Sequence, residues 1–198
     1  MAKVAPLLLG LVLAMSSVRA GAGPAEASFG LQAALALPAG NDLKVTTGPG
    51  WNPVLGADVT WHPLGTHALR CAIENWDFSG GQQDAQSPLL QRIETRVQAQ
   101  AVSATYLVRP GGVGRPWAVG VGLYLIRWSV TSSNAVAMPD QGAAFSQGRS
   151  RWTREGLGLQ VSRRLTYRLD VEARWVSSHY GYQNLPAYLG TVGLHWRF

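Results

Sequence analysis

The sequence is short of charge and has a single cysteine. Only 14% of its 198 residues are Asp, Glu, Lys or Arg, against about 25% in an average soluble domain. Low charge together with eight tryptophans argues against a disordered chain, because disorder needs high charge and few aromatic residues. The composition does not fit a coiled coil, which would be rich in Ala, Glu, Lys and Leu. The lone Cys71 excludes an intramolecular disulfide framework and a zinc site built from several cysteines.

Beyond residue 20 the chain has no apolar run that approaches the length of a membrane-spanning helix, which is about 20 residues. Residues 1–20 have the three-part layout of a secretory signal peptide: a positive Lys3, an apolar stretch over 4–15, and small residues around Ala20. We expect cleavage there, a short N-terminal segment over 21–27, and one domain over 28–198. Loss of Lys3 and Arg19 lowers the formal charge by two, from +6 to +4.

The mature chain alternates between apolar and polar or small residues with a period of two, which is typical of strands with two different faces. Eight segments show this pattern, most of them about ten residues long, the length of a tilted transmembrane strand. They cover 29–37, 52–62, 69–74, 93–107, 117–125, 156–162, 167–175 and 188–198.

The connections between these segments alternate between long and short. The long polar ones are 38–50, 79–90, 129–148 and 177–187, and the short ones are 63–66, 110–116 and 163–166. Long loops at one end, tight turns at the other, and an even strand number are the signature of an outer-membrane barrel. A sheet in lipid must also close, because an open edge would leave backbone groups unpaired in hydrocarbon. The sequence therefore predicts an all-β fold, an eight-stranded antiparallel up-and-down transmembrane β-barrel.

Aromatic residues favour the same fold, because they fall at the ends of the predicted strands. Two interfacial rings are expected in a membrane barrel, whereas a soluble eight-stranded barrel such as a lipocalin would scatter them along the strands. The predicted ring beside the long loops is Trp51, Trp76, Trp128, Trp152, Trp175 and Tyr188, and the ring beside the short turns is Trp61, Trp117, Tyr167, Trp196 and Phe198.

The chain resembles the small outer-membrane β-barrel families of Gram-negative bacteria, the OmpX/OmpW-like barrels, over residues 28–198. The sharpest similarity is the alternating C-terminus with a terminal aromatic residue, formed by Tyr188, Val192, Leu194, Trp196 and Phe198. The resemblance implies that this segment is the signal read by the barrel-assembly machinery, which would add it to a sheet edge by main-chain pairing.

The predicted inward positions carry charges of both signs. Buried charges are tolerated only when paired, so we expect an ion-pair network across the barrel formed by Arg70, Glu74, Glu94, Arg96, Arg168, Asp170, Glu172 and Arg174. Asp170 and Glu172 could do acid–base chemistry, but the flanking arginines favour ion pairing. Other strands place glycines inward, and we expect long arginines to fill the space at Gly30, Gly120, Gly122, Gly156 and Gly158. That arrangement predicts a plugged interior without an ion-conducting pore.

Few residues suggest a ligand. Arg149, Arg151, Arg154 and Trp152 cluster at the height expected for lipopolysaccharide phosphates, which arginine binds with two parallel hydrogen bonds. His62, His67 and His195 lack the spacing of a metal site. Ser177, Ser178 and His179 resemble the strand end of outer-membrane lipid A deacylases, but Gly181 stands where those enzymes carry their serine. We therefore expect no catalytic residues, metal or cofactor.

The leading functional hypothesis is a non-enzymatic outer-membrane protein whose loops, mainly 129–148, contact an external partner or lipopolysaccharide. The alternatives are porin-like passage of small or hydrophobic solutes and, more remotely, lipid A modification. The expected partners are outer-membrane lipids, lipopolysaccharide and the barrel-assembly machinery. We expect a monomer, and no nucleic acid, because an exported barrel rarely meets any.

Overall fold

The computed structural model describes residues 26–39, 50–78, 82–83, 90–112, 114–138, 142–180 and 185–198. The predicted signal peptide and most of the 21–27 segment lie outside these residues. Among the described residues every regular element is a strand. No helix of the described chain has the length and apolar character to cross a membrane.

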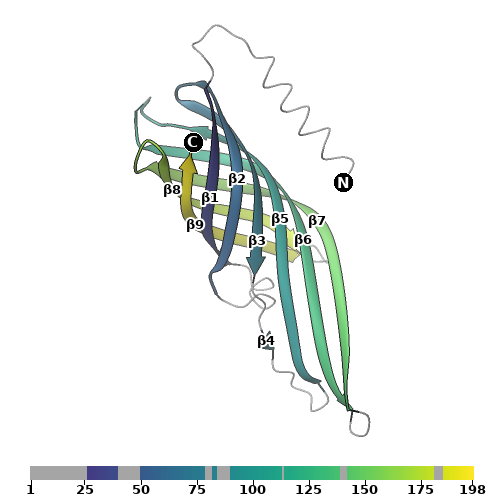
Figure 1. The fold of residues 1–198 in the computed structure, drawn as a ribbon. Coiled ribbons are helices and arrows are strands. Elements are labelled where there is room, and N and C mark those ends of the chain that lie inside the picture. The colour runs from purple at the N-terminus through teal and green to yellow at the C-terminus, as the bar shows by residue number, and fades with distance from the viewer. Residues whose placement is uncertain are drawn as a thin grey trace.

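Nine strands are described, of which eight form a closed barrel (Figure 1). Their bounds are β1 Glu26–Pro38, β2 Asn52–Leu64, β3 His67–Phe78, β4 Gln82–Gln83, β5 Leu90–Val108, β6 Trp117–Met138, β7 Gly142–Arg164, β8 Leu169–Tyr180 and β9 Leu185–Arg197. Consecutive barrel strands pair antiparallel, β9 pairs with β1, and β3 pairs with β5. The short β4 pairs only with the outer part of β5. The predicted eight-stranded up-and-down barrel is therefore confirmed.

The short turns join β2 to β3, β5 to β6 and β7 to β8, and both described ends of the chain lie beside them, so we call this the short-turn end. Main-chain hydrogen bonds tie the turns together there. The Arg109 amide donates to the Thr66 carbonyl at 2.8 Å, and the Arg164 amide donates to the Pro116 carbonyl at 2.7 Å. Short turns are the end that faces the periplasm in outer-membrane barrels, and we call the opposite end of this barrel the long-loop end.

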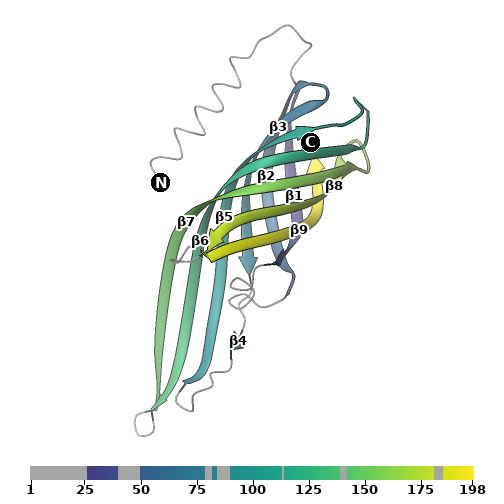
Figure 2. The same cartoon turned by 180° about the vertical axis from the view of Figure 1, so that it is seen from behind.

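Three strands continue far beyond the barrel at the long-loop end. β5, β6 and β7 contain 19, 22 and 23 residues, against about 9–11 for a membrane crossing. Pairing of β7 with β8 ends at Gly156, and pairing of β5 with β3 ends at Val97. The remaining parts, residues 90–96, 129–138 and 142–155, form a projection that we call the blade, visible in Figures 1 and 2.

The predicted long loop over 129–148 was wrong, because most of it is strand. β6 runs to Met138 and β7 begins at Gly142, so the connection is only three residues long. The segment contains few residues that favour strands, namely Val130, Thr131, Val136 and Phe145 among four serines and four alanines, and it lacks apolar alternation. A strand outside the membrane has no lipid-facing side, so the pattern that revealed the other strands is missing here.

The outer surface of the barrel between its two ends is apolar. Phe29 and Leu123 are 65% and 66% exposed, values that fit lipid contact rather than a soluble barrel. The other large apolar side chains on this belt include Leu31, Leu35, Leu55, Val59, Ile73, Val119, Val121, Leu157, Leu159, Val161, Val192 and Leu194.

The predicted facing of β5 was inverted. Val97, Ala99 and Ala101 lie inside the barrel, whereas Gln98 and Gln100 point outward. These positions lie on the long-loop side of the apolar belt, where the exterior of the barrel is polar and its interior is apolar. The same alternation therefore has the opposite meaning once a strand leaves the lipid.

The aromatic ring beside the long loops was predicted only in part. Trp51, Trp175 and Tyr188 are exposed, and the last two rings stack at 5.8 Å. Trp76 and Trp128 instead lie inside the barrel, 1% and 0% exposed, and Trp152 packs against the same interior cluster. At the short-turn end the ring forms as expected, with Trp117, Tyr167, Trp196 and Phe198 exposed and Trp61 half-buried.

Candidate functional site

The interior of the barrel contains a polar network near the short-turn end. Arg70, from β3, lies at its centre, and its Nη1 donates to Glu172 Oε1 at 2.5 Å. Its Nε donates to Thr60 Oγ1 at 3.2 Å and lies 3.6 Å from Asp58 Oδ1. Because these side chains come from β2, β3 and β8, the charges hold opposite walls of the barrel together.

His195 is the second centre of this network, and it was not among the predicted members. Its side chain is 0% exposed, and Nε2 lies 2.7 Å from Asp58 Oδ2. Arg70 Nη2 lies 3.3 Å from Nδ1, which fits the tautomer whose Nε2–H faces Asp58 while Nδ1 accepts from arginine. The sequence did contain a signal for this role of His195. It alternates with the lipid-facing residues of the last strand, as Thr191 and Arg197 do, and so lies at an inward position.

Arg197 completes the network at the short-turn end. Its Nη2 donates to Asp170 Oδ1 at 3.0 Å. Its Nε is buried without a hydrogen-bond partner among the described residues. The Arg197 guanidinium therefore donates one hydrogen bond through Nη2 and has a further N–H, on Nε, without a partner among the described residues.

A separate ion pair lies deeper in the barrel. Arg174 Nη1 donates to Glu74 Oε1, and both side chains are almost fully buried. Trp76 Nε1 donates to the other Glu74 oxygen at 2.8 Å. Glu74 therefore connects the charged half of the interior to an apolar half.

The apolar half fills the barrel toward the long-loop end, and we call it the aromatic plug. Trp128 meets Trp76 edge-on at a ring distance of 6.3 Å and stacks with Phe78 at 6.1 Å. Aliphatic side chains complete the plug, among them Val54, Val97, Ile126, Val176 and Leu189. The sequence predicted an interior filled by charged side chains, and this second, apolar layer was not predicted.

The inward glycines make room for particular side chains, and these are not the long arginines that were predicted. A Cβ on Gly30 would overlap His195 Nε2 and Asp58 Oδ2. A Cβ on Gly158 would overlap the Tyr124 ring, which also lies close to Gly122. The His195–Asp58 pair and the Tyr124 ring therefore occupy the space that these glycines leave.

Two predicted network members point away from the interior. Arg96 is exposed and pairs outside the barrel with Asp77 Oδ2 at 2.6 Å, because β5 has the inverted facing described above. Arg168 lies exposed in the β7–β8 turn, with its guanidinium 5.1 Å from the Tyr167 ring centre. The side chain of Glu94 lies outside the described residues. Arg70, Glu74, Asp170, Glu172 and Arg174 lie inside and pair as stated.

The three buried groups Asp170, Glu172 and His195 place ligand atoms within 4.8 Å of one another, the spacing of a metal site. Arg70 already donates to Glu172 and faces His195 Nδ1. A guanidinium thus supplies the positive charge between these ligands, and the arrangement is better explained as an ion-pair network than as a metal centre.

Arginines also gather on the outer surface, at the root of the blade. Arg127, Arg149 and Arg151 face outward on β6 and β7, and we call them the arginine face. They line a groove of about 180 Å³ together with Asn75, Gln98, Gln100 and Ser129. Only Arg149 and Arg151 were predicted. Trp152 and Arg154, predicted beside them, have the opposite, inward phase on β7 and are partly buried.

The arginine face lies next to the lipid-facing belt, on its long-loop side. Along β6 the outward positions pass from exposed Val121 and Leu123 through Leu125 to Arg127. Register places Arg127 between Gln100 and Thr153, and places Ser129 between Gln98 and Arg151. The groove thus offers guanidinium and amide donors where hydrocarbon gives way to headgroups.

The strand end that resembles a deacylase does not assemble a catalytic pair. Ser178 is buried and donates to the Glu155 carbonyl at 2.8 Å. His179 faces the opposite side of β8 and is exposed. Ser177 shares that outward side with His179, and no hydrogen bond between the two is among those of the described residues.

The predicted assembly signal lies on the lipid-facing side of β9. Val192, Leu194, Trp196 and Phe198 are exposed there, and Tyr188 is exposed nearer the long-loop end. β9 pairs with β8 on one side and with β1 on the other, so this strand closes the barrel.

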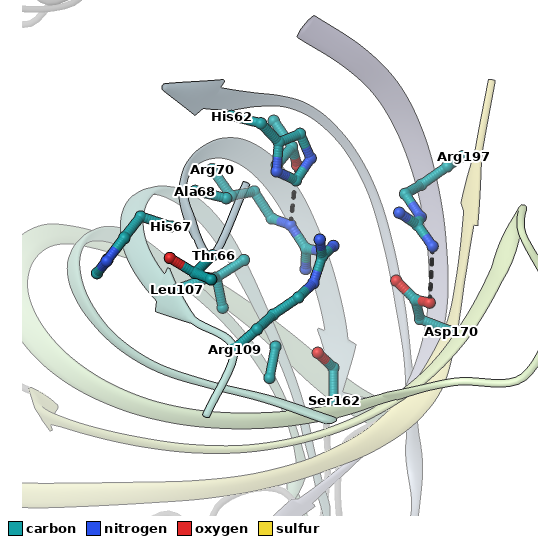
Figure 3. Close-up of a pocket in the computed structure, with 12 residues that line it drawn as sticks. His62, Thr66, His67, Ala68, Arg70, Leu107, Arg109, Ser162, Asp170 and Arg197 are labelled. Atoms are coloured by element: carbon teal, nitrogen blue, oxygen red, sulfur yellow. Dashed lines mark hydrogen bonds and ion pairs between the residues drawn. The ribbon is translucent and has the colours of Figure 1, made fainter. Parts of the chain in front are cut away.

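At the short-turn end a small pocket opens beside the polar network (Figure 3). Its cavity of about 20 Å³ has room for roughly one ordered water. Three arginines, Arg70, Arg109 and Arg197, and one carboxylate, Asp170, line it. The other polar residues of the lining are Thr60, His62, Thr66, His67 and Ser162.

Solved structures with the same fold are outer-membrane barrels. The attachment invasion locus protein Ail of Yersinia pestis is 10% identical, covers 88% of this chain and 99% of its own, and aligns with a TM-score of 0.56. The N-terminal β-barrel domain of Pseudomonas aeruginosa OprF is 13% identical, with 88% and 100% covered and a TM-score of 0.51. A major outer membrane protein of Thermus thermophilus is 15% identical, with 87% and 100% covered and a TM-score of 0.51.

No protein-family model and no curated protein matches the sequence. At these identities the structural similarity establishes the fold. Together with the apolar belt, it identifies the chain as an eight-stranded barrel of the outer-membrane type.

Proposed function

We propose that this outer-membrane β-barrel is a non-enzymatic surface protein that binds lipopolysaccharide phosphates on its arginine face and presents its blade to partners outside the cell. The observation that carries the proposal is the position of Arg127, Arg149 and Arg151, which line one groove directly above the lipid-facing belt. Phosphates of outer-leaflet lipid A lie at that boundary, and guanidinium groups bind phosphate with two parallel hydrogen bonds.

The charges around the groove support an anionic ligand. None of the residues that line it is acidic. The nearby Asp77 is engaged by two donors of Arg96, at 2.6 and 3.3 Å. Arg149 has one donor on Ser129 Oγ at 3.2 Å, which orients its guanidinium while leaving other donors for a ligand.

The test is binding of fluorescent lipopolysaccharide to the refolded barrel in maltoside micelles, measured by anisotropy. The variant is Arg127→Gln/Arg149→Gln/Arg151→Gln. The matched control removes three exposed arginines at the short-turn end, Arg115→Gln/Arg163→Gln/Arg168→Gln, so both variants lose the same net charge. We expect the first variant to weaken binding by about tenfold or more and the control to bind as the unmodified protein does.

Two results would overturn the proposal. One is equal weakening in both variants, which would mean that net charge alone governs binding. The other is undiminished binding of dephosphorylated lipopolysaccharide, which would mean that phosphate is not what the arginines recognise.

Porin-like passage is the alternative that the interior disfavours. The polar network and the aromatic plug occupy successive layers of the barrel, and the cavity at the short-turn end holds about one water. We therefore expect planar bilayers containing the purified barrel to show no stable channels. Stable single-channel steps from the folded protein would restore the porin hypothesis.

Lipid A modification is the remaining alternative, and the separation of Ser178 from His179 on opposite sides of β8 supports a protein without this activity. Mass spectrometry of lipid A from cells with and without expression tests it, and we expect identical spectra. Gel filtration with light scattering tests the expected monomer.

A further inference from the structure

The pocket at the short-turn end contains more positive charge than its neighbours neutralise. Around it the described side chains include four guanidinium groups, on Arg70, Arg109, Arg164 and Arg197, and three carboxylates, on Asp58, Asp170 and Glu172. Glu74 and Arg174 neutralise each other deeper in the barrel. Arg70 and Arg197 each pair with a carboxylate, whereas Arg109 and Arg164 have no ion pair among the described residues.

The unpaired positive charge of the pocket lies on Arg109, at its mouth, because the other arginines that line it are already paired. Arg70 is held by Glu172 and Thr60, and Asp170 is held by Arg197. The Arg109 guanidinium has no hydrogen bond or ion pair among the described residues, although it lies beside the network. Burial, and the charges of Arg164 and Arg197, lower the pKa of Arg109 from its ordinary value, as expected where like charges crowd together.

The position of Arg109 is set by the backbone. Its amide donates to the Thr66 carbonyl at 2.8 Å, which ties the β5–β6 turn to the β2–β3 turn. In Figure 3 its side chain extends from that turn toward the guanidinium of Arg70. Like charges are held together here by covalent and main-chain constraints, so an anion between them would remove the repulsion.

The pocket also has unused donors suited to oxygen. Arg197 Nε is buried without a partner among the described residues, and the hydroxyls of Thr66 and Ser162 line the same space. The enclosed cavity of about 20 Å³ has room for one oxygen-sized group, so a bound phosphate would place one of its oxygens there and keep its other atoms at the open mouth of the pocket.

We propose that this pocket binds a single phosphate group, with Arg109 as its principal contact, Arg197 beside it and the Thr66 and Ser162 hydroxyls completing the shell. The phosphate comes either from an anionic phospholipid headgroup of the periplasmic leaflet or from a soluble phosphate compound. The proposal concerns the end of the barrel opposite the arginine face and does not depend on lipopolysaccharide binding.

The first experiment titrates the refolded barrel with inorganic phosphate by calorimetry, in maltoside micelles at constant ionic strength. The variants are Arg109→Gln and Arg109→Lys, and the matched control is Arg115→Gln, an exposed arginine of the same turn outside the pocket. Heat-modifiable gel mobility confirms that each variant is folded. We expect one saturable site in the unmodified protein and the control.

In this titration Arg109→Gln should weaken binding by about tenfold or more, and Arg109→Lys should weaken it less, because lysine keeps the charge but loses the planar fork. The second experiment places the same proteins in nanodiscs of phosphatidylcholine with or without phosphatidylglycerol and measures retained lipid by native mass spectrometry.

Three outcomes decide the proposal. Arg109-dependent retention of phosphatidylglycerol supports a lipid headgroup as the source of the phosphate. Arg109-dependent binding of inorganic phosphate without lipid selectivity supports a soluble compound. Absence of both, or binding that Arg109→Gln and Arg115→Gln reduce equally, overturns the phosphate site.

Discussion

Breaking the buried pair between Glu74 and Arg174 should be among the most damaging single changes in this barrel. Their side chains are 0% and 5% exposed, so neither charge can turn to water when its partner is removed. We consider Glu74→Gln, Arg174→Met and the double variant. The double variant removes both charges together. The amide oxygen of the introduced glutamine can still accept from the Trp76 indole, and the Tyr124 hydroxyl, which also bonds Arg174, keeps Thr105 as a partner.

The expected magnitudes follow from desolvation. Removing one member of a buried pair costs about 3–5 kcal/mol, because the other charge stays buried without a counterion. Removing both costs much less, since neutral groups of similar volume replace a pair that was expensive to desolvate. The double variant should therefore be more stable than either single variant, with a coupling free energy of about 3 kcal/mol.

The assay is urea unfolding of the barrel refolded into phosphatidylcholine vesicles, followed by heat-modifiable gel mobility. Gel mobility is preferred to tryptophan fluorescence because Trp76 touches Glu74 directly. The control is the exposed pair of Arg96 and Asp77, whose side chains are 62% and 31% exposed. Arg96→Met should leave the unfolding midpoint unchanged, because exposed pairs are largely screened by water.

Additive losses in the double variant would refute this reasoning. So would single-variant losses no larger than that of Arg96→Met. Either result would mean that water or another charge reaches Glu74 and Arg174, and that the layer between network and plug is not dry.

Three further changes test other parts of the structure. Gly158→Ala should cost about 1–3 kcal/mol of unfolding free energy, because the new Cβ overlaps the Tyr124 ring; Gly148→Ala, whose Cβ would lie 3.5 Å from Ser132 Oγ, should not, and equal losses would contradict the packing argument. Replacing residues 132–148 by Asn-Gly should leave the unfolding midpoint of the barrel unchanged, because β7 before Gly156 pairs only with β6 among the described strands; a lower midpoint would show that the blade supports the barrel. Phe198→Ser should reduce the folded fraction in cells without changing spontaneous refolding into vesicles, because the terminal aromatic residue is exposed on the outside of β9 and contributes little to the interior; a matching loss in vitro would assign Phe198 a structural role instead of an assembly role.

The strands that cross the membrane could be predicted because lipid and interior impose opposite demands on alternate residues. Phe29, Leu31 and Leu35 on β1, and Val192 and Leu194 on β9, carry this pattern and face outward as expected. The charges of Arg70 and Glu172 were recognisable for the same reason, since they occupy the other phase of their strands.

The same rule failed wherever a strand left the lipid. Val97 and Ala99 look lipid-facing in the sequence, yet they belong to the aromatic plug, because above the belt water lies outside and apolar contacts lie inside. Trp76 and Trp128 were misplaced by the same reversal. The polar segment over 129–148 has no apolar alternation at all, so its sequence predicts a loop where the structure has two strands.

The sequence by itself determined the strand number, the antiparallel order and the closed barrel, because a period of two over short segments is a local property and closure follows from the lipid. Only the tertiary structure decided which charges meet. Arg70 and Glu172 are 102 residues apart and Arg70 and His195 are 125 apart, and their contacts depend on barrel closure and strand register. The arginine face and the pocket around Arg109 arise in the same way, since each assembles side chains from strands or turns that only the register brings together.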